Sequence, residues 1–264
     1  MNRYSHIFDS HAHYDDPVFD GDRGKLLSEL PSLGVYRVVD CGSDIASSEK
    51  AAALAAKYPY FYFAAGIHPE EARNLPDDWE NCIRSLLKKP KAVAVGEIGL
   101  DYHFRENPPR EVQKDIFVRQ ILLAESLGLP VIVHDREAHG DTMDILRKYR
   151  PHGVVHCFSG SVEMAKEVLG IGMYIGLGGS VTFKNARIPV EVAKMVPQDR
   201  ILLETDCPYM APVPFRGKRN DSSLIACTAS RAAEIRGEDT QELIDKACQN
   251  AERLFLSGQH TEKI

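Results

Sequence analysis

The chain has 264 residues, of which 44% are hydrophobic, and its formal net charge is −6. A chain of this size and composition buries a sizeable core. Its acidic balance argues against an indiscriminate polyanion binder, because proteins hold free duplex DNA mainly through Lys and Arg. Nucleic acid at a local site remains compatible with this charge, since a bound metal supplies positive charge there.

Short apolar, β-branched runs recur along the whole chain. They predict eight strands, at residues 6–11, 35–42, 60–68, 91–99, 130–135, 153–158, 173–179 and 200–206. Amphipathic stretches between the runs predict helices, for example at 43–58, 77–89 and 111–128, and a last helix is expected at 239–256. Most runs are apolar throughout, as strands covered on both faces are. The pattern predicts an α/β fold, a (β/α)8 TIM barrel formed by one domain over residues 1–264. A doubly wound open sheet is the alternative that periodicity leaves open.

Polar residues with metal-binding chemistry gather at the C-terminal ends of these runs. They are His11 and His13 of the first run, His68, Glu97, His134, His156 and Asp206. In a barrel, that end of every strand opens onto the face where active sites are built. A single histidine at a strand end is more often a hydrogen-bonded structural residue than a ligand. For the whole set that explanation fails, because so many polar groups would meet in one pocket at a high desolvation cost.

Divalent cations resolve this cost, because carboxylates neutralise them and imidazoles bind them. Six ligands are too many for one tetrahedral metal that also keeps a water molecule. They suit two metals that share a bridging group. The residue types therefore predict a centre of two divalent cations. They do not identify the metal, since His and carboxylate sites accept Zn, Mn, Mg, Ni or Co.

The six cysteines are scattered and include no C-x-x-C pair, so we expect reduced thiols that pack in the interior. Cys157 and Cys207 each follow a candidate ligand, and strand alternation is expected to turn them to the opposite face. The first residues show no apolar signal core, and no apolar run approaches a membrane span. We expect a cytoplasmic protein with no membrane association, and no obligate protein partner is evident.

Six segments together resemble the TatD family of metal-dependent deoxyribonucleases, which have the amidohydrolase-type barrel. These segments are DSHAHYD (9–15), GIHPEE (66–71), VGEIGLDYH (95–103), PVIVHDREA (130–138), VVHCFSGS (154–161) and LLETDCPYMAPVPFRGKRN (202–220). The resemblance implies one metal at His11, His13 and Asp206. It implies a second metal at His134 and His156, with Glu97 bridging the two.

The expected reaction is phosphodiester hydrolysis in which two metals activate a hydroxide that attacks phosphorus in line. Asp206 is the predicted proton acceptor, and Glu97 acts with it as the catalytic bridge. His68, Arg136 and Arg216 are predicted to contact the substrate, although a solvated basic loop is the commoner explanation of Arg136, Arg216, Lys218 and Arg219. A single concave barrel mouth suits single-stranded DNA ends, so the predicted activity is that of a 3′-5′ exonuclease.

Weaker features leave more than one interpretation open. Asp9 and Glu204 lie two residues before a ligand, so they either orient an imidazole or are paired in the core. The G-x-G-G at 176–179 is expected to end a strand and not to bind phosphate. Two other functions also remain open. The same centre could hydrolyse another ester, for example as a deacylase of mischarged aminoacyl-tRNA, or the protein could bind metal without turnover.

Overall fold

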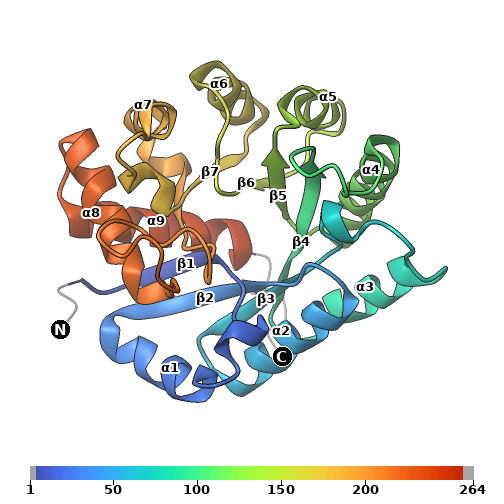
Figure 1. Ribbon diagram of the computed structural model, residues 1–264, viewed down its shortest axis with the longest axis horizontal. Helices are drawn as coiled ribbons and strands as arrows, with labels where there is room; N and C mark the ends of the chain where they lie inside the picture. Colours follow the sequence, from blue (N-terminus) through green and yellow to red (C-terminus); the bar gives the residue numbers. More distant parts are fainter. Residues whose placement is uncertain (1–3, 258–264) are drawn as a thin grey trace.

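Continuous apolar runs form eight parallel strands that lie in chain order in one sheet, β1 to β8 (Figure 1). The computed structural model describes residues 4–257. The strands are β1 (Ile7–Ala12), β2 (Val35–Cys41), β3 (Phe61–Ala65), β4 (Ala92–Asp101), β5 (Val131–Arg136), β6 (Gly153–Val155), β7 (Tyr174–Leu177) and β8 (Ile201–Leu203). Eight parallel strands with intervening helices confirm the predicted (β/α)8 barrel, and an open sheet with a reversed strand order is wrong.

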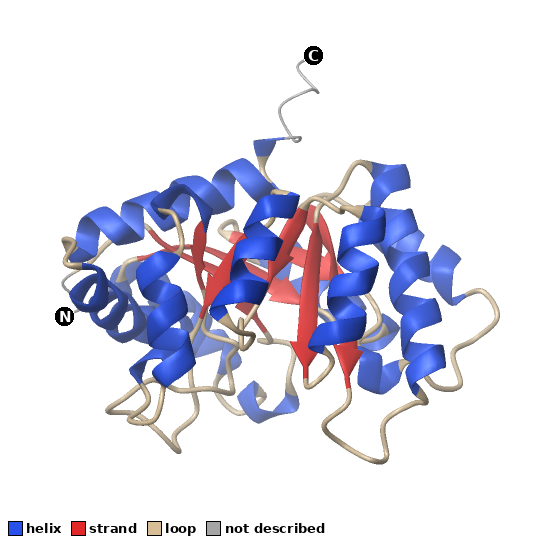
Figure 2. Cartoon of the chain, turned by 90° about the horizontal axis from the view of Figure 1, so that it is seen from above, coloured by secondary structure: helices blue, strands red, loops and turns tan. Residues whose placement is uncertain are grey.

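Helices follow the strands and form the outer layer of the barrel (Figure 2). They are α1 (Arg23–Glu29), α2 (Ile45–Lys57), α3 (Trp79–Leu87), α4 (Arg110–Leu127), α5 (His139–Tyr149), α6 (Val162–Ile171), α7 (Arg187–Met195), α8 (Ile225–Arg236) and α9 (Thr240–Phe255). Short 3-10 turns are η1 (Pro17–Phe19), η2 (Leu30–Leu33), η3 (Pro69–Glu71), η4 (Gly179–Thr182), η5 (Gln198–Arg200) and η6 (Ser222–Leu224). Within residues 4–257, no helix combines the length and the apolar character that crossing a bilayer requires.

Several helix boundaries coincide with residues that satisfy the free backbone groups of a helix end. At the start of α2, the Asp44 carboxylate accepts a hydrogen bond from the Ser47 N–H at 2.6 Å. At the start of α6, the Ser161 hydroxyl likewise accepts one from the Met164 N–H. Gly128 ends α4 with a φ of 64°, in the left-handed region that glycine adopts at little cost. The expected helices at 43–58, 77–89, 111–128 and 239–256 are confirmed within a few residues at each end.

The strands separate two layers of apolar packing. One cluster lies between strands and surrounding helices, where Phe61, Phe63 and Phe117 are fully buried. The other lies where alternate strand residues such as Phe8, Ile132 and Leu202 meet α9. The barrel floor is therefore filled with side chains, and the polar groups can collect only above it.

The first and last strands meet at their C-terminal ends. Ala12 and Cys207 form a parallel bridge, the His13 N–H donates to the Cys207 carbonyl at 2.8 Å, and the Asp206 N–H donates to the His11 carbonyl at 2.9 Å. Asp9 is fully buried and strengthens this seam, because its carboxylate accepts hydrogen bonds from the Thr205 N–H and hydroxyl and from the Ser222 hydroxyl. Asp9 is thus paired in the core and does not orient an imidazole.

The strands that precede His68, His156 and Asp206 are shorter than the apolar runs predicted. β3, β6 and β8 end at Ala65, Val155 and Leu203, so His68, His156 and Asp206 follow the strands instead of ending them. The backbone leaves the sheet at these points, and Cys157 and Asp206 take positive φ values of 41° and 57°. The side chains of Cys157 and Asp206 therefore do not follow the alternation of a regular strand. The G-x-G-G segment ends β7, as expected.

Candidate metal centre

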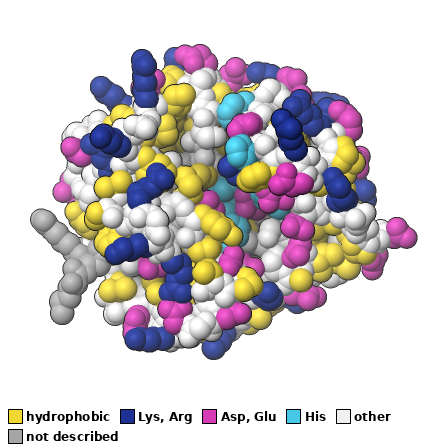
Figure 3. All heavy atoms as spheres, in the orientation of Figure 1, with side chains coloured by type: hydrophobic (Ala, Val, Ile, Leu, Met, Phe, Trp, Pro, Cys, Tyr) yellow, Lys and Arg dark blue, Asp and Glu magenta, His cyan; other side chains and the backbone are white. Residues whose placement is uncertain are grey.

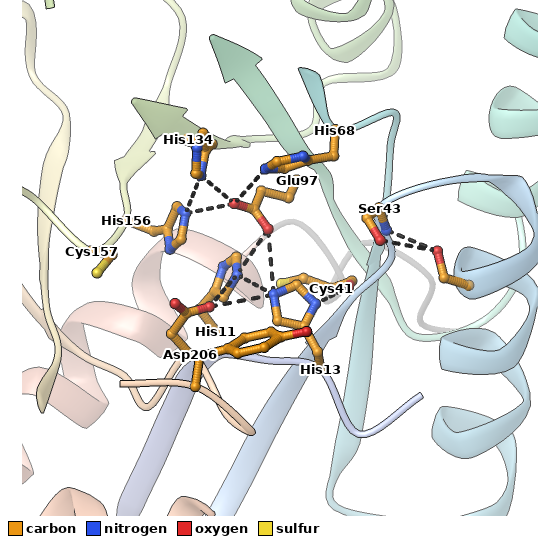
Figure 4. A network of polar contacts seen from close by, with 12 residues as sticks. His11, His13, Cys41, Ser43, His68, Glu97, His134, His156, Cys157 and Asp206 are labelled. Carbon is orange, nitrogen blue, oxygen red and sulfur yellow. Dashed lines mark hydrogen bonds and ion pairs between the residues drawn. The ribbon is translucent and has the colours of Figure 1, made fainter. Parts of the chain in front are cut away.

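Five imidazoles and one further carboxylate converge on Glu97 at the C-terminal mouth of the barrel (Figure 4). His11, Glu97 and His134 lie on β1, β4 and β5, and the others follow strands: His13, His68, His156 and Asp206. All six predicted ligands are thus brought together, and so is His68. Three overlapping groups have ligand atoms close enough to share an ion: His11 with Glu97 and His156, His11 with His13 and Asp206, and His68 with Glu97 and His134.

The two oxygens of Glu97 face different sets of imidazoles. Oε2 lies 3.2 Å from His11 Nε2 and 3.4 Å from His13 Nε2. Oε1 lies 2.7 Å from His156 Nε2 and 2.9 Å from His134 Nδ1. Asp206 stands on the first side, with Oδ1 3.4 Å from His13 Nε2 and 3.7 Å from His11 Nε2. The carboxylate of Glu97 therefore lies between a His11–His13–Asp206 group and a His134–His156 group.

Hydrogen bonds at the far nitrogens determine which ring nitrogen is free to bind a metal. His13 Nδ1 lies 2.7 Å from the Cys41 carbonyl oxygen and must donate to it, which leaves the Nε2 lone pair facing the centre. His134 is turned the other way, because its Nε2 lies 3.0 Å from Asp101 Oδ2 and its Nδ1 faces Glu97. A carboxylate or carbonyl partner of this kind is the usual support of a metal-binding imidazole.

His68 has the opposite arrangement. Its Nδ1 accepts a hydrogen bond from the Glu70 N–H at 3.3 Å, so the proton of the neutral ring is on Nε2, 3.6 Å from Glu97 Oε1. Burial, together with the neighbouring His134, lowers the pKa of His68 to about 3. His68 thus points an N–H donor into the mouth, where neutral His13 and His134 rings would offer lone pairs.

The charges of the cluster depend on one another. Burial by itself would raise the pKa of Glu97. The neighbouring imidazoles of His156, His11 and His68 outweigh burial and hold this pKa well below its usual range. Burial likewise opposes the charged form of His134, yet Asp101 and Glu97 raise its pKa to about 9. The carboxylates are therefore ionised at neutral pH. Protons or cations must balance them.

The donor set fits divalent cations on chemical grounds. His11 Nε2 and His13 Nε2 lie only 3.0 Å apart, although His13 already donates through Nδ1. Two lone pairs at this separation repel each other unless a cation or a proton lies between them. His11 Nδ1 and His156 Nδ1 are buried without a hydrogen-bond partner in the described part of the chain. The sulfurs of Cys157 and Cys207 belong to none of the three ligand groups.

Asp101 is a site residue that the sequence prediction missed. It is buried at the end of β4, and its Oδ1 accepts hydrogen bonds from the His103 N–H at 2.9 Å and from Asn107 Nδ2 at 3.0 Å. The spacing Glu97, Gly99, Asp101 along one strand contained the signal, because residues two apart share a face. Glu204 has a related position, since its Oε1 accepts the Cys157 N–H and lies 3.7 Å from His156 Nδ1.

The predicted substrate-binding cations lie at the rim of the mouth. The Arg136 guanidinium lies 4.9 Å from the centre of the Phe104 ring, and that of Arg216 lies 3.7 Å from the centre of the Phe183 ring. Arg219 differs, because it makes two hydrogen bonds to the Asp22 carboxylate at 2.6 and 2.8 Å. Arg219 is therefore held in the protein structure and is not available at the rim.

A parallel eight-stranded barrel with histidines and carboxylates gathered at its C-terminal mouth defines a metal-dependent hydrolase. The family model described as TatD related DNase matches residues 8–256. The chain is 39% identical over 252 residues to the uncharacterized metal-dependent hydrolase YabD of Bacillus subtilis, covering 94% of this chain and 98% of that protein. It is 34% identical over 260 residues to the 3'-5' ssDNA/RNA exonuclease TatD of Cronobacter sakazakii, with 96% and 98% covered.

Solved structures agree with this assignment. The crystal structure of YJJV, a TatD homologue from Escherichia coli K12, superimposes with a TM-score of 0.89 at 32% identity, covering 95% of this chain and 98% of that chain. The protein belongs to the TatD family of metal-dependent hydrolases.

Proposed function

We propose that this protein is an exonuclease that uses two divalent cations to remove nucleotides from the 3′ ends of single-stranded DNA, with residues 1–264 acting as one domain. The observation that carries the proposal is the position of Glu97, whose two oxygens face separate ligand groups. Family membership supports hydrolysis, and the relative named as a 3'-5' ssDNA/RNA exonuclease supports the choice of substrate. The six free cysteines support a cytoplasmic location.

The proposed ligands divide at Glu97. His11, His13 and Asp206 would hold one cation, His134 and His156 the other, and Glu97 both. Cations held in this way activate water and stabilise charge that develops on phosphate oxygens. Zn, Mn, Mg, Ni and Co are all compatible with these donors.

The remaining chemistry belongs to side chains of the mouth. The Asp206 side chain is 17% exposed, so it can be reached by water and substrate, and we assign to it the acceptance of the proton from the attacking water and its return to the leaving oxygen. His68 Nε2–H donates to a phosphate oxygen or to the leaving oxygen. Arg136 and Arg216 bind phosphates of the chain at the rim.

The deciding experiment compares three substrates with the metal-reconstituted protein. They are 5′-labelled single-stranded DNA, RNA of the same sequence, and a generic carboxylic ester. We expect a ladder of DNA products that shortens from the 3′ end and that chelation abolishes. Faster hydrolysis of the ester than of DNA would show that the protein is an esterase or deacylase. Binding of metal without turnover of any substrate would show that it is a metal-binding protein without catalytic activity.

A His68→Ala substitution separates a substrate contact from a metal ligand. We expect turnover to fall while about two metal ions per chain remain, as a binuclear centre without His68 requires. His152→Ala is the matched control, because His152 is exposed and lies just before β6, at the opposite end of the barrel. Loss of one ion in His68→Ala, measured by elemental analysis, would show that His68 is a ligand.

A further inference from the structure

Two adjoining hollows lie beside the metal centre, between the loops that follow β7 and β8. We call them together the rim groove. The first, about 300 Å³, is lined by residues 208–211 and 216–218 together with Phe183. The second, about 360 Å³, is lined by residues 184–186, Ser180 and Pro189, and it shares Phe183 and Arg216 with the first. Figure 3 shows histidines in a central hollow of this face, with hydrophobic side chains and Lys or Arg side chains beside it.

The rim groove begins at the catalytic mouth. Pro208 and Tyr209 follow shortly after Asp206 in the chain, and the Tyr209 ring lies 6.4 Å from the ring of His13, centre to centre. The second hollow extends away from Asp206, along η4 toward the start of α7. A chain that has one phosphate at the metals can therefore continue into the rim groove.

Hydrogen bonds hold the walls of the rim groove in place. The Val213 N–H donates to the Thr182 hydroxyl at 2.9 Å and joins the two loops. Gly179 lies against the Met210 carbonyl oxygen, where a Cβ atom would collide with it. The Tyr209 hydroxyl donates to Asp16 Oδ2 at 3.0 Å, so the ring is oriented although 56% of the residue is exposed. A groove organised before binding loses little entropy when a ligand enters it.

The lining of the rim groove combines aromatic faces with unpaired cations. Tyr209 is exposed and Phe183 is half-buried, and the Arg216 guanidinium stacks on Phe183 at 3.7 Å. Within residues 4–257, neither Arg216 nor its neighbours Lys184 and Lys218 makes an ion pair with a carboxylate, whereas Arg219 is paired with Asp22. Aromatic rings that alternate with cations are what single-stranded nucleic acid needs, since bases stack on the rings and phosphates meet the cations. Paired bases in a duplex do not expose these faces.

From this arrangement we infer that the rim groove holds the single strand on the 5′ side of the scissile phosphate. The inference rests on the proposed function. An enzyme that cuts at the 3′ end has only the terminal nucleotide beyond the scissile phosphate, so a site for more than one nucleotide must hold the retained strand. Tyr209 and Phe183 are the stacking surfaces, and Arg216, Lys184 and Lys218 face the phosphates.

The test compares binding and cleavage of DNA from two to ten nucleotides in the wild-type holoenzyme and in rim-groove variants. Phe183→Leu removes the aromatic face while keeping an apolar side chain, and Arg216→Ala removes the stacked cation. Lys148→Ala is the control. It removes an exposed cation at the last turn of α5, on the opposite end of the barrel.

We expect wild-type KM to fall as the DNA lengthens and each rim-groove variant to lose most of this gain. One lost stacking contact should raise KM for the ten-residue DNA about tenfold, with a much smaller change in kcat. In anisotropy titrations with labelled DNA, Arg216→Ala should lower the slope of log affinity against log salt by about 0.7. Lys148→Ala should match the wild type in both.

Two outcomes distinguish this inference from the proposed function. If the wild type shortens DNA but the variants keep its full dependence of KM on length, the strand lies elsewhere and the rim-groove inference is wrong. If the wild type cleaves no nucleic acid of any length, the proposed function itself falls. Tighter binding of duplex than of single-stranded DNA in the anisotropy titrations would also overturn the inference.

Discussion

The direction in which each imidazole can act depends on the hydrogen bond made by its other nitrogen. His13 donates from Nδ1 to the Cys41 carbonyl and His134 faces Asp101 through Nε2, so when the ring is neutral the other nitrogen of each offers a lone pair to a cation beside Glu97. His68 accepts from the Glu70 N–H and presents a donor instead. Residues of one type, within one pocket, are therefore suited to different tasks because their partners differ.

Asp206 is the residue at which ligation and proton transfer can be separated. Asn at this position still offers a carbonyl oxygen to a cation but cannot accept a proton near neutral pH. General-base catalysis contributes about 10²- to 10⁴-fold, so we expect Asp206→Asn to lose about a thousandfold in kcat at saturating metal. Metal analysis should show that much of the metal remains. Near wild-type turnover under these conditions would mean that another group is the base.

Asp101 is expected to set the tautomer of His134. Its Oδ1 receives two donors, from His103 and Asn107, so in the Asp101→Asn variant the amide NH2 group would take the Oδ2 position, facing His134 Nε2. His134 would then carry its proton on Nδ1, where the cation must bind. We expect Asp101→Asn to weaken binding of the second metal ion about 10- to 100-fold in a competition titration with a chelator.

A matched control for this substitution lies on the next strand. Asp135 is a carboxylate with a buried side chain whose Oδ2 lies 2.6 Å from His139 Nδ1, away from the three ligand groups. Asp135→Asn should leave the affinity for the second ion unchanged. Equal losses in Asp101→Asn and Asp135→Asn would show that the effect is general destabilisation and not control of His134.

At the scale of elements, the seam between β1 and β8 positions one of the two ligand groups of the metal centre. His11 and His13 come from β1 and its end, and Asp206 follows β8. Backbone hydrogen bonds between His13 and Cys207 and between Asp206 and His11 cross this seam. The buried Asp9 joins the same strands through Thr205, so the geometry of the His11–His13–Asp206 group depends on closure of the barrel.

Thr205→Val tests this seam. The substitution keeps the shape of the side chain but removes the hydroxyl that lies 2.6 Å from Asp9 Oδ2, which leaves a buried acceptor with a single hydroxyl partner. We expect the free energy of unfolding in urea to fall by ~1–3 kcal/mol. Ser10→Ala removes a hydroxyl that donates to the Leu203 carbonyl across the same seam, and should cost only ~0.5–1.5 kcal/mol. A larger loss in Ser10→Ala would contradict the role given to Asp9.

The helices and strands themselves were largely predictable because their signals are local. Continuous apolar runs, amphipathic periods and terminal glycines such as Gly128 depend on neighbours in the chain. The ends of β3, β6 and β8 were placed too late, since the backbone there turns to deliver His68, His156 and Asp206 to the mouth. That turn is decided by contacts between strands far apart in the chain, such as the one between Asp206 and His11.

At the scale of the whole molecule, the metal centre gathers buried charged groups that affect the stability of the fold. Glu97 is only 3% exposed and is ionised among the imidazoles of the mouth and Asp206. Without cations, protons on rings such as His134, whose pKa is about 9, balance these carboxylates. Cation binding needs neutral imidazoles, so it releases protons, and lowering the pH weakens it.

We therefore expect metal to raise the melting temperature, by an amount that shrinks as the pH falls. A ligand that binds only the folded state stabilises it by RT ln(1 + [L]/Kd), and competing protons raise the apparent Kd. Scanning calorimetry with and without chelator at pH 8 and pH 6 measures both effects. Identical midpoints at pH 8 with saturating metal would refute the centre, and a larger metal effect at pH 6 would refute the coupling to protons.

The sequence by itself determined the succession of eight strands and helices and predicted the six proposed ligands. Strand and helix patterns depend on residues that are close in the sequence, and parallel strands bring their C-terminal ends to one face whatever the conformation of the loops. The tertiary structure decided which nitrogen each imidazole presents, the part played by Asp101, the pairing of Arg219 with Asp22, and the rim groove. Each of these depends on partners that come together only when separate strands and loops pack, and hydrogen-bond geometry over such distances is not encoded in spacing along the chain.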